Sequence, residues 1–376
     1  MPDRDRPLSR LLDYYYCEQQ ALAARVNQRP AGEALSDPAC YTAVHDLAHE
    51  QARTLGEQVD RAGQTHVAHT LQQHPLEHEM LLQSAFIRHA LEKPRGDAGD
   101  MDLMRMICTF EDHGETNFAV LENRVYLNLP AAEAVRQRVA SLFEWFKELP
   151  DGSRVLNLAC GPAVEVDEYI RQQPGRALHF ELLDHDWQTV RYVRQRIDPR
   201  RAECRLGNAL QIIRGNYQTV LPRHAFMATC DPERDFRGWR TYLTPLKYTR
   251  GTLRPASYDL VYSTGLFDYI KTFPGDKTKG TVALTRRLFD LVKPGGTLIV
   301  GNYLAQSASN PHLRPHRLMM ELYSDWYLFY RTPEEIIDFL ADLPVNGYSV
   351  QLTHEYFGQN QQTERGAIGF LIINKN

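Results

Sequence analysis

The pattern of hydrophobic and polar residues changes near residue 150. Before that point, apolar residues recur at the spacing of amphipathic helices. Examples are Leu8, Leu11, Leu12, Tyr15 and Tyr16, and then Val44, Leu47, Ala48 and Leu55. The same spacing predicts helices over Leu76 to Leu91 and over Ala132 to Leu149. We expect residues 1–150 to form a helical cap, and residues 151–376 to form the domain that it covers.

After residue 153, strand-like and helix-like segments alternate, which predicts an α/β fold with a mostly parallel sheet and helices on both faces. The strands are expected at 154–158, 178–183, near 202–206, 258–262, 297–300, about 347–353 and 367–374. Helices are expected at 280–291 and, from the capping box Thr332-Pro-Glu-Glu335, as far as about Leu343. The last two strands have no helix after them, so we expect an antiparallel hairpin edge. The segment 212–256 receives no assignment.

The composition and net charge of the chain indicate which broad class of protein it belongs to. Charged residues make up 24% of the chain, hydrophobic residues 43%, and the formal net charge is −4. These values are ordinary for a soluble globular protein, and we expect no nucleic-acid partner and no membrane association. The six cysteines contain no C-x-x-C pair, and the N-terminus lacks the apolar core of a signal peptide. We therefore expect a cytoplasmic protein with reduced thiols. The oligomeric state stays open.

The first predicted strand ends in a turn made of small residues. Ala159, Gly161 and Ala163 alternate along this turn, and a helix-forming run follows from Val164. Small residues between a strand and a helix bring backbone N–H groups and the positive helix end close to a ligand. Alone, such a turn is a weak signal.

The ends of the later strands carry polar groups. Asp184 follows the second strand, Asn208 the third, and Ser263 and Gly265 the fourth. Open parallel sheets bind ligands beyond the carboxyl ends of their strands, where an acid can take both hydroxyls of a ribose. Asn208 offers a side-chain amide to a base edge. These positions together predict a nucleoside site.

This ordered set resembles the class I methyltransferases that use S-adenosylmethionine. The resemblance covers about 154–304 and includes Gly-Asn-Ala at 207–209, Tyr-Asp-Leu-Val at 258–261 and Lys-Pro-Gly-Gly at 293–296. It implies a Rossmann-like, seven-stranded sheet and S-adenosylmethionine as methyl donor or substrate. The sequence has Asn157 where the family has an acid, and alanines at 159 and 163 where the family has glycines.

The strand-end pattern, the resemblance and the charged segment Glu92–Asp100 together indicate candidate site residues. The residues expected to bind the cofactor are Arg95, Asn157, Ala159, Gly161, Asp184, Asn208, Ser263 and Gly265. The candidate catalytic residues are Tyr262, Ser263, Asn302 and Tyr303. We expect no metal, because Pro75 separates His74 from His78 and no third ligand is evident.

Three further segments, Glu92–Asp100, Ser263–Tyr269 and Asp325–Thr332, narrow the resemblance. They are similar to bacterial methyltransferases that make methyl esters of 3-hydroxypalmitate, although that group has a tyrosine where Asp97 stands. Chains of this length and layout also resemble azetidine-2-carboxylate synthases. Within Glu92–Asp100, Arg95 or Lys93 suits a carboxylate, and Asp97 or Asp100 an ammonium group. A solvated charged turn is the alternative.

Two reactions are compatible with these segments, and both make the protein an enzyme of small-molecule biosynthesis. In the first, the α-amine of S-adenosylmethionine attacks its own γ-carbon, which gives azetidine-2-carboxylate and methylthioadenosine. In the second, the methyl group passes to the carboxylate of a small acceptor or of a 3-hydroxy fatty acid. We favour the first, because the turn departs from the family pattern where the methionyl chain binds. A cofactor-binding sensor without turnover is the non-catalytic alternative.

Overall fold

The computed structural model describes residues 8–201, 209–214, 253–305, 314–354 and 367–376. The chain forms two compact units. The first, here the helical unit, contains residues 1–133 and 308–327, and the second, the sheet unit, contains residues 134–307 and 328–376. The sequence placed the division at residue 150, whereas the structure places it inside a helix, after Glu133. Whether the helical unit covers a site in the sheet unit stays a prediction.

The helical unit consists of helices and short helical turns. Its elements are α1 (Leu8–Asn27), α2 (Ala31–Ser36), α3 (Pro38–Ala62), α4 (Gln64–Gln72), η1 (Leu76–Met80), η2 (Leu81–Gln83), α5 (Ala85–Glu92), α6 (Met101–Thr109), α7 (Asn117–Leu127), α16 (Arg314–Leu318) and η4 (Met319–Tyr323). Side-chain oxygens begin several of them: Asp37 caps α3, Ser84 caps α5, Asp100 caps α6 and Thr116 caps α7. Such caps satisfy backbone N–H groups that have no partner within the helix.

The prediction of one helix over Leu76 to Leu91 was wrong. The segment forms a π-helical turn, η1, then a 3₁₀ turn, η2, and only then the α-helix α5. Ser84 is extended, and its hydroxyl accepts a hydrogen bond from the N–H of Ile87 at 3.4 Å. The apolar spacing indicated one amphipathic helix, but a serine that caps a new helix interrupts the old one.

Among the described residues, the sheet unit is built on seven strands in the order β3-β2-β1-β4-β5-β7-β6. They are β1 (Arg154–Leu158), β2 (His179–Asp184), β3 (Ala209–Arg214), β4 (Tyr258–Ser263), β5 (Val292–Tyr303), β6 (Tyr348–His354) and β7 (Ile368–Lys375). Strands β3, β2, β1, β4 and β5 run parallel, while β7 runs antiparallel to both β5 and β6. The strand expected near 202–206 lies outside the described residues, and β3 begins at Ala209.

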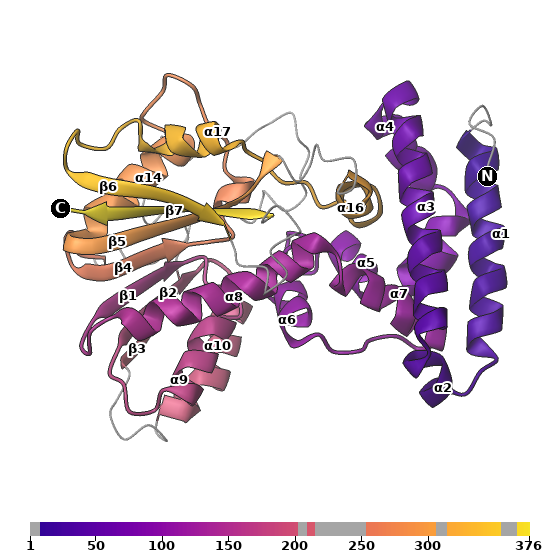
Figure 1. The fold of residues 1–376 in the computed structure, drawn as a ribbon, viewed down its shortest axis with the longest axis horizontal. Coiled ribbons are helices and arrows are strands. Elements are labelled where there is room, and N and C mark those ends of the chain that lie inside the picture. The colour runs from indigo at the N-terminus through magenta and orange to yellow at the C-terminus, as the bar shows by residue number, and fades with distance from the viewer. Residues whose placement is uncertain (1–7, 202–208, 215–252, 306–313, 355–366) are drawn as a thin grey trace. The chain divides into compact units, whose positions relative to one another are not determined.

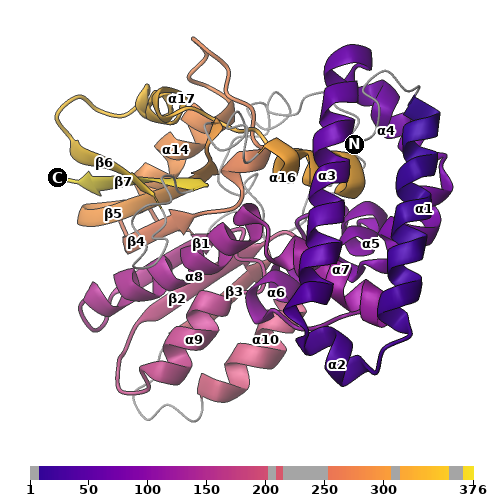
Figure 2. The same cartoon turned by 45° about the vertical axis from the view of Figure 1, so that its right-hand side comes forward.

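Helices cover both faces of this sheet (Figures 1 and 2). One face carries α8 (Pro130–Glu148), α9 (Val164–Gln172) and α10 (Trp187–Arg201), and the other carries α14 (Gly280–Leu291) and α17 (Pro333–Ile337). Side chains alternate across β1, so Leu156 and Leu158 join the core on the α14 face. Asn157 therefore points to the opposite face, where α8 and α9 lie. The alternating pattern predicted this α/β arrangement.

The C-terminal helix is shorter than predicted. The capping box of Thr332 and Glu335 is present at the start of α17, with Pro333 at its first position. The α-helix ends at Ile337, and the 3₁₀ turn η5 (Asp338–Leu340) follows it. Among the described residues, no helix combines the length and the apolar character that crossing a membrane requires.

Candidate functional site

The turn between β1 and α9 lies directly beside the end of β2. The N–H groups of Ala159 and Cys160 donate to the carbonyl oxygen of Leu183 at 2.8 and 3.1 Å. Ala159, Gly161 and Ala163 have φ angles of 61°, 52° and 48°, in the left-handed region. Glycine adopts this region freely, whereas alanine is strained there. Ala159 and Ala163, which stand where the family has glycines, thus adopt the left-handed backbone conformation that glycine adopts freely.

Asp184, at the end of β2, holds this turn in place. Its Oδ2 accepts the N–H of Gly161 at 2.9 Å, and its Oδ1 accepts the N–H of Asp186 at 3.0 Å. The residue is 5% exposed, and burial raises the pKa of its carboxyl above the ordinary value. A carboxylate has about four acceptor sites, so Oδ2 keeps a lone pair for a ligand hydroxyl. A Cβ on Gly161 would meet open space, so a ligand can approach the backbone there.

Asn157, Tyr262 and Glu165 form a buried hydrogen-bonded cluster at the ends of β1 and β4. The Nδ2 of Asn157 donates to the hydroxyl of Tyr262 at 2.9 Å and to Oε1 of Glu165 at 3.1 Å. The Tyr262 hydroxyl donates to the same Oε1 at 2.8 Å. Burial raises the pKa of Glu165 above the ordinary value, and it raises the pKa of Tyr262 well above its own. The structure thus brings together two predicted site residues, Asn157 and Tyr262, with an acid that was not predicted from the sequence.

Ser263 and Gly265, after β4, contact the protein itself. The fully buried hydroxyl of Ser263 donates to the carbonyl oxygen of Leu158 at 2.9 Å, which ties β4 to β1. A Cβ on Gly265 would lie 3.1 Å from Nη1 of Arg138, and that nitrogen donates to the carbonyl oxygen of Thr264 at 2.6 Å. The missing side chain at 265 therefore makes room for the Arg138 guanidinium. These contacts leave the predicted ligand roles of Ser263 and Gly265 untested.

Asn302 and Tyr303, at the end of β5, belong to a second buried polar cluster. The Nδ2 of Asn302 donates to the carbonyl oxygens of Tyr303 and Phe329 at 2.8 and 2.9 Å, and its Oδ1 accepts from Arg331. The N–H of Tyr303 donates to Oδ1 of Asp268 at 2.6 Å. Because both amide hydrogens of Asn302 are used, this side chain fixes the backbone around it.

Asp268 and Arg331 carry the charges of this second cluster. Burial raises the pKa of Asp268 to about 6 and lowers the pKa of Arg331 to about 10. The Arg331 guanidinium also donates to the carbonyl oxygen of Phe267 at 2.9 Å. Two segments singled out in the sequence, Ser263–Tyr269 and Asp325–Thr332, therefore meet here.

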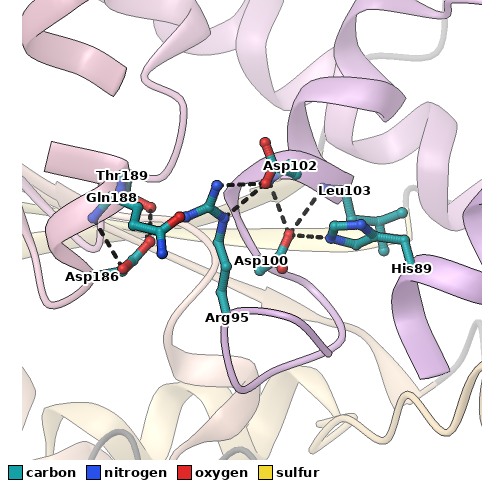
Figure 3. Close-up of polar contacts among 8 residues, drawn as sticks. All are labelled: His89, Arg95, Asp100, Asp102, Leu103, Asp186, Gln188 and Thr189. Atoms are coloured by element: carbon teal, nitrogen blue, oxygen red, sulfur yellow. Dashed lines mark hydrogen bonds and ion pairs between the residues drawn. The ribbon is translucent and has the colours of Figure 1, made fainter. Parts of the chain in front are cut away.

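Arg95 lies in the helical unit and is paired with an acid there. Its Nε and Nη2 donate to Oδ2 of Asp102 at 2.8 and 2.6 Å (Figure 3). Asp100 is 5% exposed, and its Oδ1 accepts from His89 Nε2 at 2.7 Å and from the N–H groups of Asp102 and Leu103. Lys93 forms an ion pair with Asp325. Residues 92–100 thus form an ordered, hydrogen-bonded turn, and a ligand contact of Arg95 stays a prediction.

Among the described residues, a group of possible metal ligands lies beside this turn. One ligand atom each from His89, Asp100 and Asp102 lies within 4.8 Å of the others. Arg95 already neutralises Asp102, and His89 and Asp100 are hydrogen-bonded to each other. We assign no metal to these residues. His74 and His78 instead bond to Asp13 and to the carbonyl oxygen of Gln72.

Asn208, the predicted contact to the base, lies outside the described residues, so its role stays a prediction.

Comparisons with known proteins show a fold shared with a solved structure and leave the family open. No protein-family model matches the sequence, and no curated protein matches it. A solved structure from Bordetella parapertussis, described as a possible exported protein, aligns with a TM-score of 0.51 and 16% identity over 90% of this chain and 99% of that one. At that identity the match shows a shared fold, and the description of that protein names no activity.

Structures described as S-adenosylmethionine-dependent enzymes or as biosynthetic proteins align less well. A methyltransferase from Thermotoga maritima, described as a possible histamine N-methyltransferase, has a TM-score of 0.35 and 13% identity over 64% of this chain and 91% of that one. The pyocyanin biosynthetic protein PhzM has a TM-score of 0.40 and 12% identity over 80% of this chain and 70% of that one. We draw no functional argument from scores this low.

Three charged residues of the sheet unit were not predicted from the sequence: Glu165, Arg138 and Asp268. Glu165 stands four residues after the central glycine of the turn, in the first turn of a helix that was itself predicted. Its position after a small-residue turn was a usable signal. Arg138 is on α8, far from the strand ends in sequence, and no local pattern indicates its contact with Thr264.

Proposed function

We propose that this protein is an enzyme that binds S-adenosylmethionine at the carboxyl ends of β1, β2 and β4. One observation carries the proposal: the buried carboxyl of Asp184 accepts the N–H of Gly161 at 2.9 Å, next to open space beside that glycine. This joins an acid suited to a ribose with a turn suited to close backbone approach. The order of motifs in the sequence supports S-adenosylmethionine among nucleoside ligands.

In this proposal the ribose hydroxyls donate to Asp184, and the methionyl chain lies towards Asn157 and Tyr262. Burial favours this arrangement, because Asn157 is 4% exposed and Tyr262 is fully buried. Hydrogen bonds in such a water-poor place are stronger than at the surface. Both Asn157 bonds use Nδ2, so neither uses its Oδ1 acceptor.

The preferred reaction is cyclisation of S-adenosylmethionine to azetidine-2-carboxylate. The α-amine attacks the γ-carbon, the bond between that carbon and sulfur breaks, and methylthioadenosine leaves. Free α-amino groups have a pKa near about 8, so modest desolvation is enough to provide the neutral amine. Orientation of the folded methionyl chain then supplies most of the acceleration. Asn157 in place of the family's acid is the feature that favours this reaction.

Methyl transfer to a carboxylate acceptor is the alternative, and one experiment separates the two. Purified protein is incubated with S-adenosylmethionine alone, and the products are identified by mass spectrometry. We expect methylthioadenosine and azetidine-2-carboxylate in equal amounts. Formation of S-adenosylhomocysteine only when a carboxylic acid is added would contradict cyclisation and support methyl transfer. Tight binding of S-adenosylmethionine without turnover would indicate a sensor.

A further inference from the structure

Glu165 is an acid whose place in the fold the proposed function does not explain. It belongs to the first turn of α9, yet it is 7% exposed and faces the cluster at the ends of β1 and β4. A carboxylate is costly to bury unless hydrogen bonds or opposite charge compensate for it. A helix start alone needs no buried acid. The position therefore requires a reason beyond helix stability.

The Glu165 carboxyl accepts hydrogen bonds from two side chains and from its own backbone N–H, and both side chains donate to the same oxygen. Asn157 at 3.1 Å and Tyr262 at 2.8 Å both donate to Oε1. Neither reaches Oε2. The Asn157 Nδ2 also donates to the Tyr262 hydroxyl at 2.9 Å, so the three groups fix one another's orientation. The carboxyl is thus held rigidly by one oxygen, which orients the other.

Glu165 contacts Asn157, the position at which the sequence differs from the family that it resembles. The family has an acid at position 157, and here that position is an asparagine that donates directly to Glu165. Two ionised carboxylates at this separation would repel each other, so an acid at 165 is compatible with a neutral residue at 157. Arg138 lies close enough to lower the pKa of Glu165, although burial raises it more.

We propose that Glu165 is the carboxylate that binds the α-amino group of the S-adenosylmethionine methionyl chain and takes up its proton. This inference rests on the proposed function. An incoming ammonium group favours the ionised form of the Glu165 carboxyl and so opposes the effect of burial on its pKa. Asn157 and Tyr262 are positioning residues, because they hold Oε1 and leave Oε2 for the amine.

During cyclisation, one ammonium proton moves to Glu165, which becomes a neutral carboxyl group. The nitrogen lone pair then forms the bond to the γ-carbon. The bond between the γ-carbon and sulfur breaks, and its electron pair stays on sulfur, which removes the sulfonium charge. The ring nitrogen carries the positive charge in the product.

The test compares ligands with and without the amino-acid moiety. Calorimetry on the full chain measures the binding of S-adenosylmethionine and of 5′-methylthioadenosine, which lacks the amino-acid part of the methionyl group, to the wild type and to Glu165→Gln. We expect the variant to lose about tenfold or more in affinity for S-adenosylmethionine, as loss of a charged hydrogen bond predicts, and to keep its affinity for methylthioadenosine. Glu168→Gln is the matched control, since Glu168 is on the same helix with a side chain 36% exposed. It should change neither affinity.

If Glu165→Gln loses affinity equally for both ligands, or for neither, the proposed role of Glu165 is wrong. The acid would then serve only the structure around α9. If Glu165→Gln does not fold, Glu165→Asp keeps the charge and shortens its reach. That variant should also weaken S-adenosylmethionine selectively, and an unchanged ratio of the two affinities would count against the proposal. A wild type that binds neither ligand would refute the proposed function itself, which is a different result from either outcome with the variants.

Discussion

At the scale of single residues, the buried carboxyl of Asp268 has the clearest measurable consequence. It accepts the N–H of Tyr303, and its pKa is raised to about 6 by burial, above the ordinary value near 3.8. Between these two pKa values, the folded protein therefore keeps a proton on Asp268 that the unfolded chain has already released. Between about pH 4 and pH 6, ionisation of Asp268 costs folding free energy, and the cost is complete above about pH 6.

We predict that Asp268→Asn becomes more stable relative to the wild type as the pH rises from about 4 to about 7. The asparagine Oδ1 still accepts from Tyr303, but the side chain does not ionise. A shift from 3.8 to about 6 corresponds to a relative gain on the order of 3 kcal/mol. Urea unfolding of both proteins at several pH values across this range measures it.

Asp276→Asn is the control for that series. Asp276 is a partly exposed acid whose pKa is lowered to about 2, chiefly by hydrogen bonds from Thr278 and Lys279. Its stabilising contribution is present above its ordinary pKa and is lost as the pH falls, so this variant should show the opposite trend. A stability difference between Asp268→Asn and the wild type that is constant with pH would contradict the assignment of Asp268.

At the scale of elements, the turn from β1 to α9 stores backbone strain. Ala163 ends the turn with φ of 48°, and Gly161 has φ of 52° with enough open space around it for a Cβ. A left-handed alanine costs roughly 1–2 kcal/mol, partly offset by the greater freedom of glycine in the unfolded chain. The two positions therefore make a matched pair.

We predict that Ala163→Gly raises the free energy of unfolding by about 0.5–1 kcal/mol and that Gly161→Ala lowers it by about the same amount. Urea unfolding at one pH is sufficient for both. If Ala163→Gly is destabilising by more than the freedom of glycine explains, its methyl group is needed for packing and the strain argument is incorrect. Ala163 is fully buried, so such a packing role has a physical basis.

Much of the sheet unit could be predicted, because its elements obey local rules. The strand at 154–158, the helix at 280–291 and the capping box at Thr332 all lie where apolar spacing and cap chemistry placed them. The predictions that were wrong concerned the ends of helices, which tertiary contacts or single capping residues determine. Ser84 divides a continuous apolar stripe, and α17 changes to 3₁₀ geometry after Ile337.

The candidate site could be proposed from the sequence where it follows strand ends, and not where its contacts join residues that are distant in the sequence. Asp184 and Asn157 were selected because they belong to strand ends in an ordered set. Glu165 and Arg138 lie on helices, and only packing brings them to the ends of β1 and β4. Asn302 was selected for a catalytic role, which stays a prediction, and its contacts show that it fixes backbone around Arg331.

At the scale of the whole molecule, the helical unit is discontinuous in sequence. Residues 308–327 return to it after the strands of the sheet unit have begun. Contacts such as Gln64 to Glu321 at 2.8 Å and the ion pair of Lys93 with Asp325 hold this returning segment. No local pattern reveals such a return, since these partners are 257 and 232 positions apart in the sequence.

The central claim is that the full chain binds S-adenosylmethionine at Asp184, and calorimetry with the wild type, Asp184→Ala and Asp186→Ala tests it most directly. Asp186 is the control, because this neighbouring acid bonds to Gln188 and Thr189 at the start of α10 (Figure 3). We predict binding by the wild type and by Asp186→Ala, and none by Asp184→Ala, which loses the ribose contact and the bond to Gly161. Circular dichroism checks that each variant is folded. Undiminished binding by a folded Asp184→Ala, or none by the wild type, would contradict this account.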